Sequence, residues 1–216
     1  MEKFSGYEEI EIKNFEKYET LELGGHVCKI LRVKIETITP KTGNFKPWRQ
    51  LIIDFDIAES DPQAGFYKRR YEKDVQKDVT TAKWKGVFKV NIPRDDGSED
   101  DKKSKENFKR FITCIENSNN GYDWEKSNWD ESTLVGKLFA GVFGIEEFLN
   151  NEGNVLYFTK CRFVRSVNQL EDITIPKVKL VDNNYMDYEE WLEAKQGKTS
   201  ENIGTTVVEE DDDLPF

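Results

Sequence analysis

The fold is decided by residues 26–38, which read HVCKILRVKIETI. Apolar residues recur there largely at every second position, at Val27, Leu31, Val33 and Ile35, with charged residues between them. A period of two is typical of a β-strand that has one face in a core and the other toward solvent. We therefore predict a strand over 26–38 as the first clear element of a β-rich domain.

A second alternating stretch at 48–58 predicts another strand, because apolar and polar residues again exchange at successive positions. Residues 39–44, between the two stretches, have the composition of a turn. The two strands should therefore form a hairpin, and its connecting loop carries Lys41 and Lys46.

Three more strands and one helix are predicted downstream. A third strand at 84–92 has one apolar and one basic face, and residues 106–117 place apolar side chains at helical spacing. The stretches 134–145 and 155–167 predict a second hairpin, with bulges or tight corners at the glycines Gly136, Gly141 and Gly144. This element order is that of an OB-fold, so the predicted class is mainly β with minor helix, arranged as an OB-fold-like five-stranded barrel.

The flanking segments differ from this central part in composition. We interpret 1–24 as an N-terminal lead-in, 25–170 as the OB-fold-like domain, 171–195 as a C-terminal extension with a short helix, and 196–216 as a flexible, disordered tail. Residues 93–105 are too polar to pack and are predicted to be a mobile acidic insertion.

Charge is distributed unevenly along the chain. The net charge of −10 argues against a polyanionic partner if only the total is considered. Residues 25–94, however, hold 15 basic and 8 acidic residues, whereas residues 196–216 hold 1 and 6. The resulting sums of +7 and −5 indicate a basic surface beside an acidic tail, which is compatible with nucleic-acid binding.

Binding of single strands requires flat rings for the bases and cations for the phosphates. The stretch 66–73 interleaves both kinds of side chain in what reads as a loop. We expect one of its three aromatic rings to anchor the stretch in the core and the other two to be available for stacking. The candidates are Phe66, Tyr67, Lys68, Arg69, Arg70 and Tyr71.

Strand residues supply further candidates. Trp48 shares a face with polar residues, so it is either a stacking residue or a partly buried one. Trp84 falls in the apolar register and is assigned to the core. Lys85 and Lys89 then point to the opposite face of the strand, where they are candidates for phosphate contacts. The remaining cationic candidates are Lys41, Lys46 and Arg162, the last of which points away from Arg165 in strict alternation.

The chain ends in an acidic run closed by an apolar residue, EEDDDLPF at 209–216. Five acids cannot pack into a core, so the segment gains little from folding alone. A partner's pocket for the last ring, with basic groups for the carboxylates, would satisfy it. A solubilising tail is the alternative, but it does not explain the apolar ending. The predicted partner-binding residues are Asp211, Asp212, Asp213, Leu214, Pro215 and Phe216.

The Asp-Asp-Asp-Leu-Pro-Phe ending resembles the C-terminal tip of bacterial single-stranded DNA-binding proteins (SSB). This resemblance covers six residues and implies recruitment of replication and repair enzymes. Residues 24–171 are similar in general pattern to OB-fold single-stranded DNA-binding proteins that phages and mobile elements of Gram-positive bacteria encode. That likeness rests on GGHVC at 24–28, the strand that begins at Trp48, LVGK at 134–137 and the strand with Arg162 and Arg165.

Other classes of function have little support. The single histidine, His26, has no serine or cysteine motif around it, and no Walker or dinucleotide-binding motif occurs, so we expect no enzyme and no cofactor. Asp54 and Asp56 are the acidic pair best placed for a two-metal nuclease, and they also conflict with a uniformly basic groove. Three cysteines without paired spacing indicate neither disulfides nor a zinc site.

No apolar run is long enough to span a membrane and no secretory signal is visible at the N-terminus, so we expect a cytoplasmic protein. The hypothesis is a protein that coats single-stranded DNA without sequence specificity and recruits host or phage replication and recombination enzymes through its tip. A homo-oligomer is compatible with this hypothesis. The alternative is an acidic interaction or DNA-mimic protein that recruits host factors without binding DNA.

Overall fold

The computed structural model describes residues 19–40 and 46–199, which form a mainly β protein. The elements are β1 (Gly24–Ile38), β2 (Trp48–Ile57), α1 (Phe66–Lys77), β3 (Val87–Ile92), α2 (Glu99–Ser118), a 3-10 helix η1 (Glu131–Leu134), β4 (Leu138–Leu149), β5 (Val155–Arg165), a second 3-10 helix η2 (Val167–Asp172), β6 (Val178–Lys179), β7 (Tyr185–Met186) and α3 (Tyr188–Thr199). The described strands make one mixed sheet in the order β3-β2-β1-β4-β6-β7, and β5 pairs with β4 off this path.

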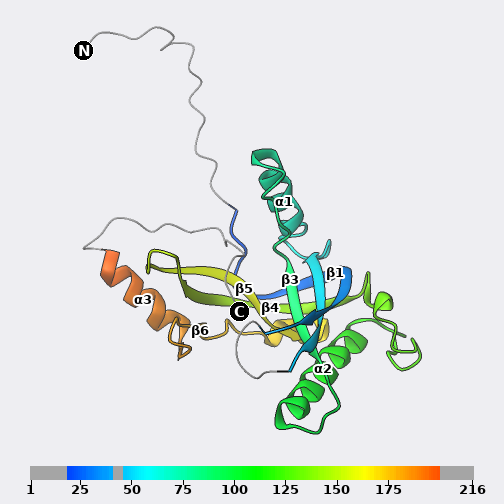
Figure 1. Cartoon of the computed structure of the whole chain (residues 1–216). Helices are drawn as coiled ribbons and strands as arrows, with labels where there is room; N and C mark the ends of the chain where they lie inside the picture. Colours follow the sequence, from blue (N-terminus) through cyan, green and yellow to red (C-terminus); the bar gives the residue numbers. More distant parts are fainter. Residues whose placement is uncertain (1–18, 41–45, 200–216) are drawn as a thin grey trace, which may run out of the picture.

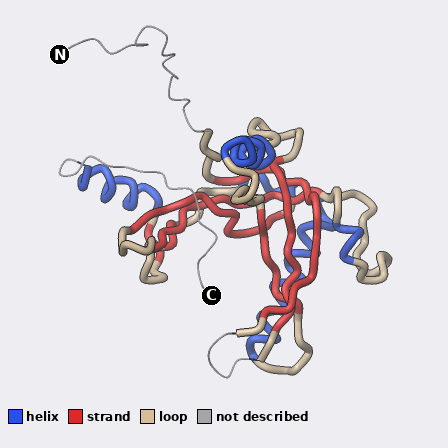
Figure 2. The backbone as a smooth tube through the Cα atoms, turned by 45° about the horizontal axis from the view of Figure 1, so that its top comes forward, coloured by secondary structure: helices blue, strands red, loops and turns tan. Residues whose placement is uncertain are grey.

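Strand β1 belongs to two parts of this sheet. Residues 24–29 pair with β4, whereas residues 28–38 pair with β2. A register shift between Ile30 and Arg32 interrupts the second pairing, and such irregularities bend a strand. The strands accordingly form two diverging arms in Figure 2, one with β4 and β5 and the other with β2, β3 and the second half of β1.

The described sheet does not close into a barrel, which corrects the five-stranded barrel predicted from element order. Among the described strands, β3 pairs with β2 alone and β5 with β4 alone. Helix α2 contacts both of these strands: Phe111 stacks on Phe88 of β3 with ring centroids 6.3 Å apart, and the Cys114 thiol lies 3.6 Å from the Val164 carbonyl oxygen of β5. Helix α2 therefore takes the place of direct pairing between β3 and β5, and Figure 1 shows where this helix lies relative to the strands.

The main core lies between the sheet and α2. Phe55 of β2 is fully buried and meets the rings of Tyr67 and Phe139 edge-on, with centroids 5.4 Å apart in both pairs. Burial of one such ring stabilises a fold by about 1.5–3 kcal/mol. A smaller cluster around Trp191 attaches α3 to β4, and the Trp191 indole donates a hydrogen bond of 2.8 Å to Glu147.

Residues 66–73, predicted to be a loop, form the first turns of α1 instead. The helix follows Gly65, which has a left-handed φ of 72° and no side chain that could cap the helix. The carboxylate of Asp56 supplies the missing acceptors, because it binds the backbone N–H groups of Tyr67 and Lys68 at 2.9 and 3.2 Å. The helix start is therefore stabilised by a residue of β2, ten positions upstream.

Residues 93–105, predicted to be a mobile insertion, contain the beginning of α2. Ser98 is the N-cap, and its hydroxyl accepts a hydrogen bond of 3.1 Å from Asp101 N–H. The buried Asp101 carboxylate in turn accepts from the backbone N–H groups of Arg94 and Asp95 at 2.8 and 2.9 Å. Acidic residues in the first turn favour a helix start. The same charges that suggested disorder therefore stabilise the N-terminal end of this helix.

Candidate nucleic-acid interface

Strands β1, β2 and β3 share an outer face that points away from the core. Lys34 of β1 is opposite Ile52 of β2, which is in turn opposite Lys89 of β3. Both lysines are exposed, whereas Ile52 is 4% exposed. Long lysine side chains cover apolar surface with their methylene groups and keep their ammonium groups in water. This row, which we call the basic row, therefore offers two exposed cations on either side of a covered isoleucine.

The two aspartates of β2 have structural roles. Asp54 lies opposite Arg32 of β1 and accepts a hydrogen bond of 2.7 Å from its Nε. Asp56 caps α1. Both carboxylates are buried and already hold partners, so neither repels a phosphate as an unpaired surface charge would. The Arg32 side chain remains 68% exposed next to the basic row.

Metal binding has no support from the described residues. Within 19–40 and 46–199, no three His, Cys, Asp or Glu side chains gather as metal ligands would. His26 is buried, with Nδ1 at 3.1 Å from the Asp61 carboxylate and Nε2 at 3.0 Å from the Glu22 carbonyl oxygen. The contact with Asp61 ties the start of β1 to the segment after β2, and the two contacts together occupy both ring nitrogens.

Four of the predicted strand and loop residues lie on or beside the outer face. Lys89 is part of the basic row and Lys46 is exposed just before β2. Trp48 is half-buried, in the same alternation as Ile52, and its indole nitrogen has no acceptor among the described residues. Lys85 is half-buried before β3.

Trp84 lies outside β3, although the sequence placed it in that strand. It is half-buried against the main core, as the apolar register predicted. Its indole nitrogen donates to the carbonyl oxygens of Phe55 and Gly86 at 3.1 Å each. Its ring lies 5.8 Å from that of Tyr71, so it joins the base of α1 to the start of β3.

The aromatic residues of the 66–73 stretch are mostly committed to packing. Phe66 and Tyr67 are 3% and 6% exposed and contact each other edge-on at 5.2 Å. Neither ring presents a face to solvent, which corrects their assignment as stacking residues. Tyr71 is half-buried beside Trp84. The physical reason is that the start of α1 packs against Phe55 rather than lying on the surface as a loop.

The cations of the same stretch lie on α1, which projects from the sheet in Figure 1. Lys68 and Arg69 are exposed and Arg70 is half-buried. The Arg69 guanidinium is paired with the Glu19 carboxylate. Lys68 makes only a long, exposed ion pair with Glu72 at 3.9 Å. Lys68 and Arg70 therefore remain candidates for phosphate contact, at one end of the molecule.

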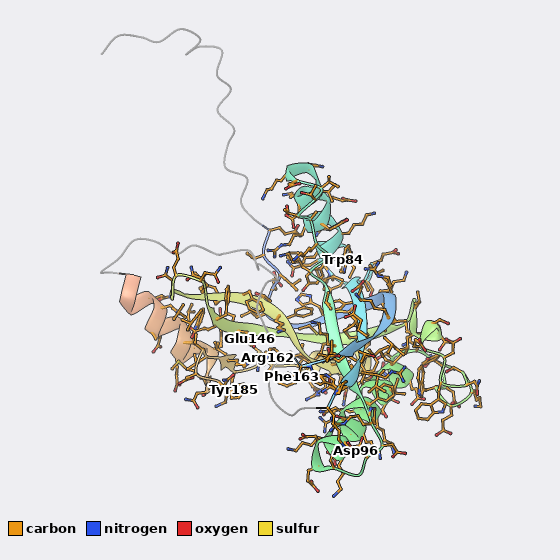
Figure 3. All side chains as sticks on the ribbon, viewed as in Figure 1. Trp84, Asp96, Glu146, Arg162, Phe163 and Tyr185 are labelled. Atoms are coloured by element: carbon orange, nitrogen blue, oxygen red, sulfur yellow. The ribbon has the colours of Figure 1, made fainter. Side chains whose placement is uncertain are left out.

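Arg162 lies on β5, on the arm opposite the basic row. Its guanidinium carbon is 5.6 Å from the centre of the Phe163 ring and 5.5 Å from that of Tyr185. Figure 3 shows these three residues together, apart from Trp84. Arg165 is exposed at the end of β5.

Two predicted groups of residues cannot be placed. Lys41 and the tip residues 211–216 lie outside the described residues.

Sequence reasoning also missed functional candidates that the structure brings forward. Arg32 and Lys34 were visible in the alternation of residues 26–38, because each lies between core positions. Phe163 and Tyr185 gave no such signal.

Burial and hydrogen bonding shift the pKa of several groups in the described part of the chain. Burial alone would raise the pKa of Asp101, but hydrogen bonds from Lys105 and from the backbone of residues 94–97 outweigh it and lower the pKa from 3.8 to about 2. Burial raises the pKa of the Cys161 thiol to about 12 and that of Cys28 well above its ordinary value. Thiols in this state are poor nucleophiles.

Comparisons with known proteins add no family. No protein-family model matches the chain, and a search of curated proteins returned no match. None of the helices within residues 19–40 and 46–199 combines the length and apolar character needed to cross a bilayer.

Proposed function

We propose that the protein binds single-stranded DNA without sequence specificity, in replication or recombination, through the outer face of β1, β2 and β3. The observation that carries this proposal is the basic row of Lys34, Ile52 and Lys89, flanked by Arg32. Cations on such a face follow the phosphate backbone of a single strand.

The strand connectivity supports interpretation as an open OB-fold. Strands β1, β2 and β3 form consecutive antiparallel pairs, α2 follows, and β4 returns to pair with β1 before β5 pairs with β4. An OB-fold has this order, can be partly open, and binds oligonucleotides over its second and third strands. The basic row crosses those two strands.

The C-terminal tip has a separate role in this proposal. Residues 211–216 would engage replication and recombination enzymes, for which an acidic segment with an apolar end is suited. Attachment of the tip to the DNA-binding part raises the effective concentration of a captured enzyme at the coated strand. Deletion of 209–216 should abolish capture of such enzymes.

The proposal is tested by neutralising the basic row. We expect the double variant Lys34→Gln with Lys89→Gln to bind fluorescently labelled oligo-dT more weakly than the unaltered chain. Each phosphate contact to a single strand contributes about 0.7 to the slope of log K against log salt, so loss of two contacts should flatten the slope by about 1.4. Anisotropy titrations at several salt concentrations measure both quantities.

Helix α2 supplies a matched control. Lys102→Gln with Lys109→Gln removes two exposed lysines from α2, and α2 packs on the core-facing side of β3. Lys102 is ion-paired with Glu99 just as Lys34 is with Glu36, so both double variants break one surface ion pair. Equal slopes for the two double variants would reject the proposed interface. Failure of the unaltered chain to bind oligo-dT would favour the acidic interaction or DNA-mimic function.

A further inference from the structure

The second arm of the sheet carries an exposed aromatic cluster built around an arginine. Phe163 of β5 is 44% exposed and Tyr185 of β7 is 58% exposed. The guanidinium of Arg162 contacts both rings. We call these three residues the β5–β7 stack. Its members come from two elements, and β7 belongs to the segment that follows the five strands of an OB-fold.

A bulge in β5 places Arg162 and Phe163 next to each other on one face. Phe143 of β4 is opposite Cys161 and Val142 is opposite Phe163, so Arg162 is the extra residue. The alternation of buried positions shifts accordingly: Cys161 and Val164 are both buried, although they are three residues apart and not two or four. A bulge re-aims side chains in this way. It releases Phe163 from the core register, in which strict alternation had placed it.

Arg162 is held in position by backbone groups. Its Nη1 donates to the carbonyl oxygens of Ile145 and Lys177 at 3.4 and 3.3 Å. A side chain on Gly144 would lie 2.5 Å from the Pro176 ring and 3.5 Å from Arg162 Cγ, so the glycine leaves room for both. The arginine is therefore preorganised between its two aromatic neighbours, and less rotamer entropy is lost when a ligand binds.

The charges around the stack favour an anionic ligand. Lys160 lies over the Phe158 ring at 5.6 Å on the same strand. Glu146 lies between Lys160 and Lys179, at 3.3 and 2.5 Å. Burial of Glu146 would raise its pKa, but these lysines lower it, so the carboxylate is ionised and neutralised. Lys177 pairs with Asp187 at 3.1 Å, and hydrogen bonds from Asn184 lower the pKa of Asp182 in the turn before β7. The four cations Arg162, Lys160, Lys177 and Lys179 outnumber the three carboxylates of Glu146, Asp182 and Asp187.

We propose that the β5–β7 stack is a second binding site for single-stranded nucleic acid, in which a base stacks on the ring of Tyr185, the more exposed of the two rings, beside Phe163. The inference rests on the proposed function, because the DNA strand bound on the outer face of β1, β2 and β3 would continue to this second site. A ring that only fastened β7 to β5 would be buried by that contact. Here both rings keep about half of their surface, and cations that suit phosphates lie beside them.

The test measures binding of the full chain to labelled oligo-dT and to an abasic deoxyribose-phosphate strand of equal length. We expect Tyr185→Ala to weaken dT binding about 5-fold to 150-fold, the range for loss of one base stack. On the abasic strand the same variant should bind within about 2-fold of the unaltered chain. Tyr185→Phe keeps the ring and should bind dT normally. Trp129→Ala removes a ring of similar exposure on the loop before η1 and should also have no effect.

The outcomes separate this inference from the proposed function. If Tyr185→Ala and Phe163→Leu both bind dT normally while the Lys34 and Lys89 variant is impaired, the second site is rejected and the proposed function stands. Equal losses on dT and on the abasic strand would also reject stacking. If the unaltered chain does not bind dT, both proposals fail. Thermal midpoints of the variants establish that each is folded, and Phe163→Leu preserves apolar volume if Tyr185→Ala loosens β7.

Discussion

Replacement of Gly86 by alanine should destabilise the protein more than the same replacement at any other described glycine. A Cβ atom at this position would lie 2.2 Å from the Phe55 carbonyl oxygen and 2.8 Å from the Tyr67 ring. The first of these is a backbone atom inside the sheet, so it cannot rotate away. Gly86 precedes β3, and its displacement would disturb the strand that carries Lys89.

The magnitude follows from the contacts that must move. Gly86 O accepts a hydrogen bond of 2.8 Å from Phe55 N–H, and the Trp84 indole donates to the oxygens of both residues. Overpacking costs about 1–3 kcal/mol, and each of the two N–H donors involved, that of Phe55 and the shared one of the Trp84 indole, adds about 0.5–1.5 kcal/mol when its hydrogen bond is distorted. We expect a loss of about 2–6 kcal/mol, a large part of the 5–15 kcal/mol that is typical of a domain.

Urea unfolding followed by circular dichroism measures this loss as a shift of the midpoint at constant slope. Gly153→Ala is the control, because a side chain there meets nothing within 4 Å but the backbone has a φ of +81°. Left-handed backbone costs a non-glycine residue about 1–2 kcal/mol. A Gly86→Ala loss no larger than the control loss would refute the close packing of Phe55, Tyr67 and Gly86.

Three further predictions concern buried polar groups. The lowered pKa of Asp101 means that the folded state binds fewer protons than the unfolded state, so its stabilisation is present above about pH 4 and lost as pH falls toward 2; Asp101→Asn should flatten the unfolding free energy in that window. Asp56→Ala should destabilise α1 by about 0.5–2 kcal/mol and speed amide exchange of Tyr67 and Lys68, whereas unchanged exchange would contradict its capping role. Cys28 and Cys161 should react with an alkylating reagent at pH 8 far more slowly in the folded than in the urea-unfolded protein, and rapid labelling of either in native buffer would contradict their burial.

Strand positions were predictable because each strand has one face in the core. Period-two alternation located β1, β2 and β5 to within a few residues and paired them into hairpins. The helix α2 was found from its apolar spacing, although its first turns were not. The motif Ser98-Glu99-Asp100-Asp101 is a capping-box pattern and was the signal that would have extended it.

The remaining errors arise from contacts between residues distant in sequence. The start of α1 depends on a carboxylate from β2, and no local pattern reports that. The phase change in β5 depends on its pairing with β4, so Phe163 reads as a core residue in the sequence alone. Closure of the sheet depends on whether α2 or a strand lies between β3 and β5, and element order does not distinguish these arrangements.

The most direct test of the central claim is a titration of the full chain with oligo-dT and with duplex DNA of equal length. The account predicts tighter binding to the single strand, with an affinity that falls steeply between about 50 and 200 mM salt. A preference for duplex DNA, or an affinity for oligo-dT that does not change with salt, would contradict it.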